Sequence, residues 1–337
     1  MSIEIATAKR LVEYSPAFDT DVIATVIEHA ARQASYDSHY DYIQDSIGVD
    51  LNDWTKDTPI LDHQPDEYDP GEALCVYLPL QNPLNGNQLT SLASIAATNP
   101  NKRLIAQANP AGRGANPNTL ERADRQRVAH KSDFRPMARP LVEYAAQTGV
   151  ERAHLFGPSF GTDLVAAAID DKAFDTVTAT LLDPVSIKLR RRLPFLLDFL
   201  KAGQRLDEYV DAPGLAMVRD AHEESFDVID GAVALLRHTN RANVDGMKKG
   251  ALPKRLHQAM PASPETVLTV AWGEASELAV HSLMQSLMVG LKRDFGGRVF
   301  DMSFAGQGHA LGSDNHLQDA VVLQGIKNGD KEPSKDS

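Results

Sequence analysis

The sequence predicts an α/β fold with a mostly parallel central sheet flanked by helices, and three observations support this prediction. From residue 73 onward, short apolar runs alternate with stretches of helical periodicity. The runs are continuously apolar rather than alternating, which is typical of strands buried on both faces in a parallel sheet. The chain has 337 residues, of which 42% are hydrophobic, so it can bury a sizeable core.

The expected strands and helices follow one another regularly along the middle of the chain. We expect strands at 73–80, 103–108, 152–157 and 176–183, and helices at 88–97, 119–148 and 160–171. Strand character returns at 266–272 and 298–304, with a helix at 278–295 between them. Each of these strands is followed by a helical stretch or a long connection, as parallel strands require.

The flanking and inserted segments are less regular. A capped helix is expected at 19–34, and Tyr36 to Ile43 suggest one or two strands, so residues 1–70 are taken as an N-terminal helix and first strands. Residues 186–262 contain helical pieces and no convincing strand, which predicts a helical cap inserted into a core of residues 1–185 and 263–323. Residues 324–337 are polar, which predicts a disordered tail.

Composition and charge exclude several functions. The formal charge of −12 disfavours nucleic acid and anionic membranes as main partners, because both require clustered basic residues. The one basic run, Lys188 to Arg192, is interpreted as a solvated helix face. A single cysteine, Cys75, rules out an intrachain disulfide and a multi-cysteine metal site. With neither a signal peptide nor a run of ~20 apolar residues, we expect a cytoplasmic protein without a membrane span.

One pentapeptide points to nucleophilic catalysis. Gly157-Pro158-Ser159-Phe160-Gly161 lies between the strand 152–157 and the helix 160–171. In Gly-x-Ser-x-Gly, small residues on both sides of the serine let a strand and a helix pack closely, and the turn exposes the hydroxyl. The pattern therefore predicts that Ser159 is a nucleophile.

A nucleophilic serine needs a base, and the base needs a group that orients it. After the last expected strand comes Ala305-Gly306-Gln307-Gly308-His309, which puts a histidine on a loop at the carboxyl end of that strand. Ligands and catalytic groups of open α/β sheets gather at this edge. We therefore expect His309 to be the base, whereas the other histidines, His316 among them, are interpreted as surface or packing residues.

These motifs together resemble the α/β-hydrolase superfamily, over about Ala73 to Leu323. The matching pieces, in chain order, are Val76 to Gln81, Asn109 to Gly114, Gly157 to Gly161, Trp272 to Glu274, and Gly308-His309. Their order and spacing resemble serine hydrolases that carry a helical cap. The resemblance implies the α/β-hydrolase fold, with Ser159 as the nucleophile and His309 as the general base.

The acid of the implied triad has three candidates. The superfamily usually places an aspartate at the position that Ser276 occupies here. Glu277, beside it, is the first choice. Asp183, at the end of the strand 176–183, is the alternative, because some members take the acid from that strand, and Glu274 is third.

The oxyanion hole implied by the resemblance uses two backbone N–H groups. One belongs to Phe160, directly after the nucleophile. The second comes from the turn after the strand 73–80, which points to Leu80 or Gln81. Many members have His-Gly in this turn, but this chain has Pro79, which has no N–H to donate, followed by these two residues.

The function predicted from these residues is that of an esterase- or lipase-like serine hydrolase that cleaves a carboxylic ester through an acyl-enzyme. The alternatives are cleavage of a thioester, lactone, amide or carbon–carbon bond on the same scaffold, or a catalytically inactive binding protein. The apolar segment 193–200 either walls an acyl pocket or packs the cap helices. We expect a small-molecule substrate and no cofactor or metal, and the sequence leaves the oligomeric state open.

Overall fold

The computed structural model describes residues 2–14, 18–51, 60–79, 86–108, 120–204, 215–225 and 238–331. Within these ranges a seven-stranded sheet has the strand order β1-β3-β2-β4-β5-β6-β7. The strands are β1 (Ile60–His63), β2 (Glu72–Tyr77), β3 (Arg103–Gln107), β4 (Arg152–Pro158), β5 (Thr176–Leu182), β6 (Val267–Gly273) and β7 (Val299–Phe304).

The sheet confirms the predicted mostly parallel arrangement. Strand β1 pairs antiparallel with β3 at one edge, and all the other neighbours pair parallel. Strands β2 and β3 are buried along almost their whole length, which is why they read as continuous apolar runs in the sequence. The carboxyl ends of the parallel strands meet at one edge of the sheet, where loop residues can converge.

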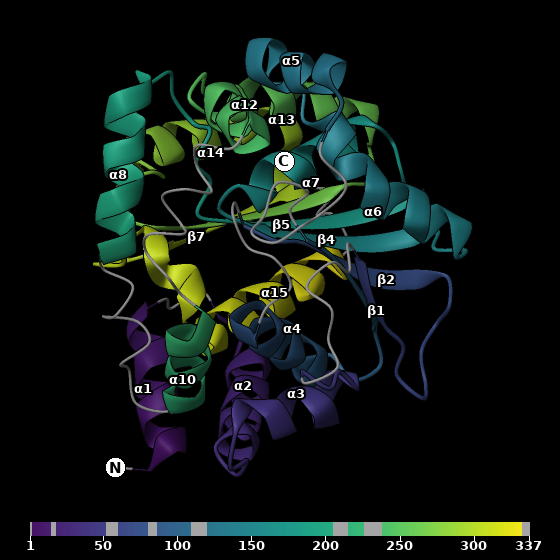
Figure 1. The fold of residues 1–337 in the computed structure, drawn as a ribbon, viewed down its shortest axis with the longest axis vertical. Helices are drawn as coiled ribbons and strands as arrows, with labels where there is room; N and C mark the ends of the chain where they lie inside the picture. Colours follow the sequence, from purple (N-terminus) through teal and green to yellow (C-terminus); the bar gives the residue numbers. More distant parts are fainter. Residues whose placement is uncertain are drawn as a thin grey trace.

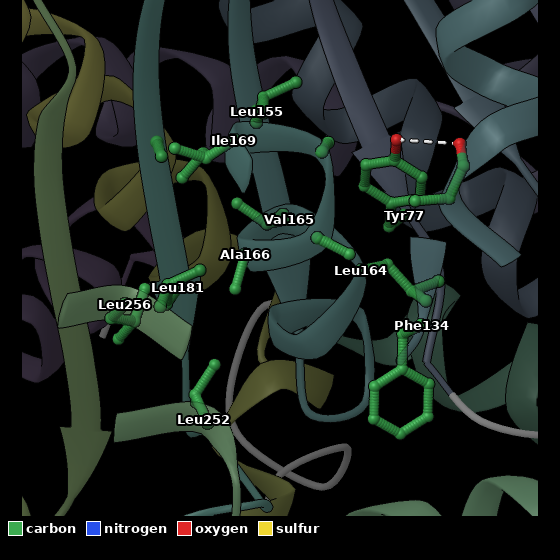
Figure 2. Close-up of a cluster of buried hydrophobic side chains, with 14 of the residues drawn as sticks. Tyr77, Phe134, Leu155, Leu164, Val165, Ala166, Ile169, Leu181, Leu252 and Leu256 are labelled. Atoms are coloured by element: carbon green, nitrogen blue, oxygen red, sulfur yellow. Dashed lines mark hydrogen bonds between the residues drawn. The ribbon is translucent and has the colours of Figure 1, made fainter. Parts of the chain in front are cut away.

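Helices cover both faces of the sheet (Figure 1). On one side lie α5 (Arg122–Lys131), α6 (Arg135–Gln147), α7 (Gly161–Asp170), α12 (His238–Met247), α13 (Leu252–Ala262) and α14 (His281–Phe295). Helix α7 is buried at the centre of this layer. Figure 2 shows Leu164 and Val165 of α7 among apolar side chains of the strands, with Leu155 of β4 and Leu181 of β5 nearby.

The opposite side holds the N-terminal helices and the last helix. These are α1 (Ile3–Tyr14), α2 (Thr20–Gln33), α3 (His39–Ile47), α4 (Gly86–Thr98) and α15 (Asn315–Gly329), and α10 (Ala216–Ser225) packs against α3 and α4. A second apolar cluster lies between these helices and the sheet, with Leu92, Phe156 and Val321 among its buried members. The sheet is thus buried on both faces.

The expectation of strands at Tyr36 to Ile43 is wrong, because residues 39–43 belong to α3 and the residues before them are not in a strand. Ser38 caps the helix, since its side chain accepts a hydrogen bond from the backbone N–H of Asp41. Tyr42, Ile43 and Ile47 are buried together on one side of it. Aromatic and β-branched residues favour strands in isolation, but burial at helical spacing decides here.

The predicted tail at 324–337 is also wrong in its first part. Helix α15 continues to Gly329, and its polar residues make buried contacts instead of facing water. The Oε1 atom of Gln324 accepts the backbone N–H of Asp19 at 2.9 Å, and Asn328 Nδ2 donates to Thr269 Oγ1 at 3.2 Å. Residues 332–337 lie outside the described part of the chain.

Between the neighbouring strands β5 and β6 the chain forms α8 (Arg192–Gln204), α10, α12 and α13. These helices do not share one location. Helix α13 packs against α7, and α10 packs against α4 on the other side of the sheet. Helix α8 stands at the margin of the molecule. The insertion of residues 186–262 as a separate cap remains a prediction, and its last helix contributes Leu252 and Leu256 to the main core.

Candidate active site

Ser159 lies at the turn between β4 and α7, at the carboxyl edge of the sheet. Its backbone has φ of +52°, in the left-handed region that non-glycine residues rarely adopt. The turn is held in place because the Ser159 N–H donates to the carbonyl oxygen of Leu182, at the end of β5, at 2.8 Å. A strained serine at a strand-to-helix turn is the expected geometry of a nucleophile that presents its hydroxyl.

The two glycines around Ser159 are required by close backbone contacts. A Cβ atom on Gly157 would overlap the backbone of Gly161, and one on Gly161 would overlap the carbonyl oxygen of Tyr77 in β2. Strand β4, helix α7 and strand β2 therefore approach one another more closely than any side chain would allow. This explains the Gly-x-Ser-x-Gly spacing in the sequence.

His309 begins a short 3-10 helix, His309–Ser313, that follows β7. Its Nε2 lies 2.9 Å from Ser159 Oγ, although 150 residues separate the two in the sequence. The side chain of His309 is 10% exposed. The preceding loop is anchored to the loop after β6, because the Ala275 N–H donates to the carbonyl oxygen of Gln307 at 2.9 Å.

Asp183, which follows β5, faces the other ring nitrogen of His309. Its Oδ2 is hydrogen-bonded to His309 Nδ1, and its side chain is only 2% exposed. A carboxylate at Nδ1 favours the tautomer with the proton on that nitrogen, which leaves Nε2 free to accept a proton from Ser159. The backbone of Asp183 is also left-handed, with φ of +50°.

Two further donors fix the Asp183 carboxylate. The backbone N–H of Gly273 donates to Oδ1 at 2.9 Å, and the hydroxyl of Ser276 donates to Oδ2 at 2.6 Å. Ser276 is buried. Hydrogen bonds of this kind stabilise the ionised carboxylate and fix its orientation.

The structure brings one of the three acid candidates into contact with His309. Asp183, the alternative candidate, contacts His309. For Glu277, the first choice, the structure shows a hydrogen bond from the Arg190 side chain to the Glu277 backbone carbonyl oxygen. The third candidate, Glu274, is exposed, and its Oε1 accepts a hydrogen bond from Ser303 at 2.8 Å. Asp183 is the candidate that reaches His309 because it follows β5 directly, and the end of β5 is hydrogen-bonded to Ser159. We call residues 157–161, the turn that carries Ser159, the elbow.

The candidate oxyanion donors are only partly described. Phe160 follows Ser159 directly and precedes the first residue of α7, so its N–H lies at a helix N-terminus, where backbone dipoles favour negative charge. Leu80 and Gln81 lie outside the described residues, as does the Asn109 to Gly114 loop. The second donor therefore remains a prediction.

A buried ion pair holds the first turn of α7. Asp163 Oδ1 lies 2.9 Å from an Arg255 nitrogen of α13, and Asp163 Oδ2 accepts the Ser186 hydroxyl. Burial raises the pKa of Asp163, and the neighbouring guanidinium of Arg255 opposes this shift. Arg255 also lies over the ring of Phe134, 5.0 Å from its centroid. The helix that begins at the elbow is thus tied to the chain between β5 and β6.

Helix α8 brings an aromatic side chain to the site. The Phe199 ring lies edge-on to His309, with centroids 6.0 Å apart and planes at 80°. Phe195 is fully buried and packs edge-on against Phe199. By contrast, Leu193 and Leu197 are 68% and 47% exposed. Of the two expectations for segment 193–200, packing within the protein describes Phe195, and Phe199 extends the same apolar surface to His309.

Three residues at this site were not among the predicted site residues. Ser276 stood at the usual acid position, so a hydroxyl there was a signal that it could bond to an acid placed elsewhere. Arg190 lay within the basic run interpreted as solvated, and it is buried. Phe199 was one of several apolar residues in its segment. Nothing in the sequence alone distinguished the last two.

Among the residues that the structure describes, no group of three His, Cys, Asp or Glu side chains could hold a metal ion. In those same ranges, no helix has the length and apolar character needed to cross a bilayer.

Comparisons with known proteins agree with the fold. No protein-family model matches the chain, and no curated protein sequence matches it. Among solved structures, the chain is similar to 2-hydroxy-6-oxo-6-phenylhexa-2,4-dienoate hydrolase from Rhodococcus sp. strain RHA1, with a TM-score of 0.50, 18% identity, and 80% of this chain and 93% of that one covered. It is also similar to E-2-(acetamidomethylene)succinate hydrolase, with a TM-score of 0.51, 15% identity, and 80% and 94% covered. The chain has the α/β-hydrolase fold.

Proposed function

We propose that this chain, which has the α/β-hydrolase fold, is a serine hydrolase that cleaves a carboxylic ester through an acyl-enzyme. One observation carries the proposal, namely the continuous hydrogen-bonded series from Ser159 through His309 to Asp183. A nucleophile, a base and a carboxylate in this order form the arrangement that activates a serine hydroxyl, whatever fold carries it.

The residues have complementary roles in the proposed reaction. His309 Nε2 accepts the hydroxyl proton as Ser159 Oγ attacks the ester carbonyl, and His309 then gives that proton to the departing alcohol. Asp183 holds the ring and stabilises the imidazolium that forms during the attack. In the second half of the reaction a water molecule gives a proton to His309 as its oxygen attacks the acyl carbon. The bond between that carbon and Ser159 Oγ then breaks, and His309 returns the proton to Oγ, so that the carboxylic acid is released and Ser159 is restored.

The negative charge that develops on the carbonyl oxygen needs donors that are already in place. The N–H of Phe160, at the start of α7, is one proposed donor, and Leu80 or Gln81 supplies the other. Because these are backbone groups, their loss cannot be tested by removing a side chain. A proline at position 81 would remove one candidate N–H.

An ester with an apolar acyl or alkyl group is the proposed substrate class. The support is the edge-on contact between Phe199 and His309, with Phe195 behind it, since these rings offer an apolar wall beside the catalytic base. The proposed substrate is a small molecule, and no step of the proposed mechanism uses a cofactor or a metal.

Covalent labelling tests the proposal. The full-length protein should react with a fluorophosphonate probe at Ser159, and Ser159→Ala should abolish the labelling. Turnover of a series of p-nitrophenyl esters of increasing acyl length should then be measurable, with matched thioester, lactone and amide compounds to identify the bond that is cleaved best. A folded protein that neither labels nor turns over any of these compounds would contradict the proposed function.

A further inference from the structure

Arg190 lies in the basic run Lys188 to Arg192, but its environment differs from that of its neighbours. Lys188 and Arg191 are exposed, whereas the side chain of Arg190 is 4% exposed. Burial of a guanidinium group is unfavourable unless its N–H groups are bonded to acceptors. Burial accordingly lowers the pKa of Arg190. The groups that accept hydrogen bonds from Arg190 offset the cost of burying it, and they indicate its role in the structure.

One set of acceptors belongs to the loop that follows β6. Arg190 Nη2 donates to the carbonyl oxygens of Glu277, at 3.0 Å, and Leu278, at 2.9 Å. Two neighbouring carbonyls bound by one nitrogen fix the local course of the backbone. Arg190 is itself held by its backbone N–H, which donates to the carbonyl oxygen of Lys248 at 2.6 Å.

The loop fixed in this way carries Ser276. The Ser276 Oγ accepts hydrogen bonds from the N–H groups of Leu278 and Ala279, at 3.3 and 3.0 Å. With both lone pairs occupied, the hydroxyl hydrogen is directed to Asp183 Oδ2, the same oxygen that bonds His309. A shift of this loop would therefore move the donor that orients the acid.

A second set of contacts leads to α8. Arg190 Nη1 donates to Asp198 Oδ2 at 2.6 Å, and the guanidinium carbon lies 5.8 Å from the centre of the Phe195 ring. Asp198 is adjacent in sequence to Phe199, whose ring meets His309 edge-on. Arg190 is therefore connected to His309 in two ways. Hydrogen bonds connect them through the loop of Ser276 and through Asp183, and ring contacts connect them through Phe195 and Phe199.

We propose that Arg190 is a positioning residue of the active site, which fixes the Ser276–Asp183 contact and at the same time holds Phe199 of α8 against His309. It does not touch the reacting atoms. This inference rests on the proposed function. It assigns a role at the site to a residue of the basic run that nothing in the proposed mechanism uses directly.

The geometry requires an arginine at this position. The planar guanidinium reaches the two loop carbonyls with one nitrogen and Asp198 with another. A lysine carries the same charge on a single nitrogen, so it cannot hold both partners in this arrangement. Arg190→Lys therefore keeps the charge and removes the connection between the loop and α8.

The experiment compares Arg190→Lys, Arg190→Ala and the control Arg191→Gln in the full-length protein. The control removes an exposed arginine of the same run. Turnover of a short-chain p-nitrophenyl ester is expressed per serine labelled by the fluorophosphonate probe, so that unfolded molecules are not counted. Arg190→Ala is also assayed with a low, non-denaturing concentration of guanidinium chloride, against sodium chloride at equal ionic strength. NMR follows the Nδ1 proton of His309 in each protein.

We expect kcat per labelled serine to fall about tenfold to a hundredfold in both Arg190 variants, because small displacements of catalytic groups have effects of this size. Guanidinium should restore part of the activity of Arg190→Ala, and sodium chloride should not. The His309 Nδ1 proton resonance should shift or broaden in both variants and stay unchanged in Arg191→Gln.

Two results would overturn the proposal: wild-type kcat per labelled serine in both Arg190 variants, or an unchanged Nδ1 proton resonance. The NMR measurement does not depend on turnover. A wild-type protein without activity whose resonance depends on Arg190 would thus contradict the proposed function and leave the positioning role supported.

Discussion

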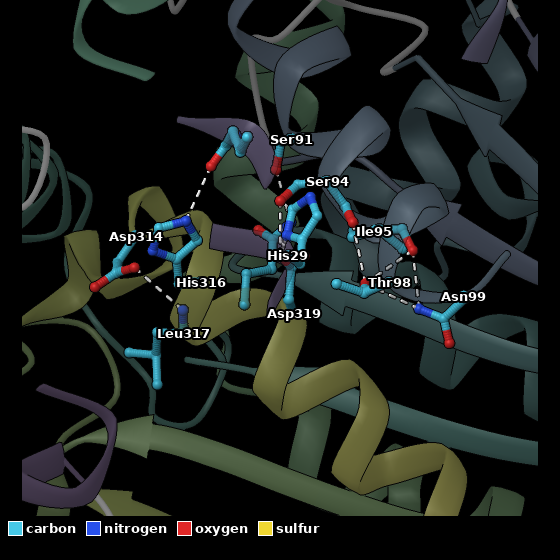
Figure 3. A network of polar contacts seen from close by, with 12 residues as sticks. His29, Ser91, Ser94, Ile95, Thr98, Asn99, Asp314, His316, Leu317 and Asp319 are labelled. Carbon is cyan, nitrogen blue, oxygen red and sulfur yellow. Dashed lines mark hydrogen bonds and ion pairs between the residues drawn. The ribbon is translucent and has the colours of Figure 1, made fainter. Parts of the chain in front are cut away.

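Two groups of serine, histidine and aspartate lie in different parts of the molecule, one at the carboxyl edge of the sheet and one among the helices on one of its faces, and only the first has the arrangement of a catalytic triad. The first is Ser159, His309 and Asp183. The second, which we call the α15 cluster, consists of Ser94, His29 and Asp319 together with Tyr42, and lies between α2, α3, α4 and α15 (Figure 3). The same residue types occur in both, so composition does not separate them.

The order of the contacts separates the two groups. In the active site, His309 stands between the hydroxyl and the carboxylate. In the α15 cluster, Asp319 stands in the middle, because Ser94 Oγ donates directly to Asp319 Oδ2 at 2.6 Å. His29 Nε2 is 2.8 Å from the Tyr42 hydroxyl, and its Nδ1 is 3.4 Å from Asp319. A base that does not contact the serine cannot take its proton.

The surroundings of the two groups differ as well. Ser159 lies at a strained turn, whereas Ser94 lies within α4, a regular helix. Asp319 is fully buried, and burial raises its pKa. His316 beside it accepts a hydrogen bond from Arg10, and burial together with that cation holds the pKa of His316 well below its usual range. The α15 cluster therefore joins helices, and its serine is bonded to the carboxylate rather than to the histidine.

The largest expected difference concerns the two serines. Ser159→Ala should lower kcat about a millionfold, because the covalent route is lost. Ser94→Ala should leave kcat per active site unchanged and lower the free energy of unfolding by about 1 kcal/mol, through the lost bond to Asp319. Esterase assays and urea unfolding measure the two effects. A large loss of kcat in folded Ser94→Ala would remove the distinction between the groups.

The two aspartates should differ in the same way, with a smaller effect on activity. Asp183→Asn should lower kcat about 10⁴-fold, because an amide at this position favours the wrong histidine tautomer. Asp319→Asn should affect stability instead, by about 1 to 3 kcal/mol. Both variants keep the shape of the side chain, so circular dichroism spectra should match the wild type. Equal kcat for Asp183→Asn and the wild type would exclude Asp183 as the acid.

Local geometry explains which parts of the site could be predicted from the sequence. The elbow is encoded by Gly157 and Gly161, which the backbone contacts demand, and its serine stands between them. His309 follows the last strand, and its place at the sheet edge follows from parallel topology. The acid could not be predicted in this way, because Asp183, Glu274 and Glu277 all follow strands that end at that edge. The position of the end of β5 beside Ser159 and the course of the loop after β6, which turns Ser276 toward Asp183, together decide among them.

The strands could be predicted from the sequence, whereas helix α3 and the end of α15 could not. Continuous apolar runs of this length predict parallel strands because such strands are covered by helices on both faces, so that both sets of side chains are buried. Helix α3 was mistaken for strands, since its aromatic residues are strand-like and its burial depends on contacts with α4, which lie outside the local sequence. The polar end of α15 was mistaken for a tail, since the partners of Gln324 and Asn328 come from the distant Asp19 and Thr269.

The third comparison is between the wild type and a variant at His316, and it concerns how the free energy of unfolding changes with pH. The pKa of His316 is held well below its usual 6.5, so below about pH 6.5 the unfolded chain binds a proton here that the folded protein does not. Stability therefore falls as the pH falls, by about 1.4 kcal/mol per pH unit for this one group. His316 Nδ1 accepts from Arg10, and His316 Nε2 lies 2.9 Å from Gln33 Oε1. His316→Gln keeps an acceptor for Arg10 and a donor for Gln33, and it cannot titrate. Its free energy of unfolding should fall less steeply between about pH 6.5 and 5.5.

Chemical denaturation at several pH values measures this slope in both proteins. Asp314 and Asp319, whose pKa values burial raises, contribute with the opposite sign, because the folded protein then binds more protons than the unfolded chain. They are present in both proteins, so the difference between the slopes isolates the histidine. Identical slopes would mean that His316 gains a proton in the folded protein, as a catalytic histidine must.

The smallest expected effect concerns Glu277, the residue that the sequence favoured as the acid. Its carbonyl oxygen is bound by Arg190, so this hydrogen bond of the loop is made by the backbone and survives a side-chain change. Glu277→Gln should therefore change kcat by less than about threefold, against the 10⁴-fold expected for Asp183→Asn. Assays of both variants with one p-nitrophenyl ester, normalised to labelled serine, make the comparison direct. If Glu277→Gln lost more activity than Asp183→Asn, the carboxylate bonded to His309 would not be the one that the reaction uses.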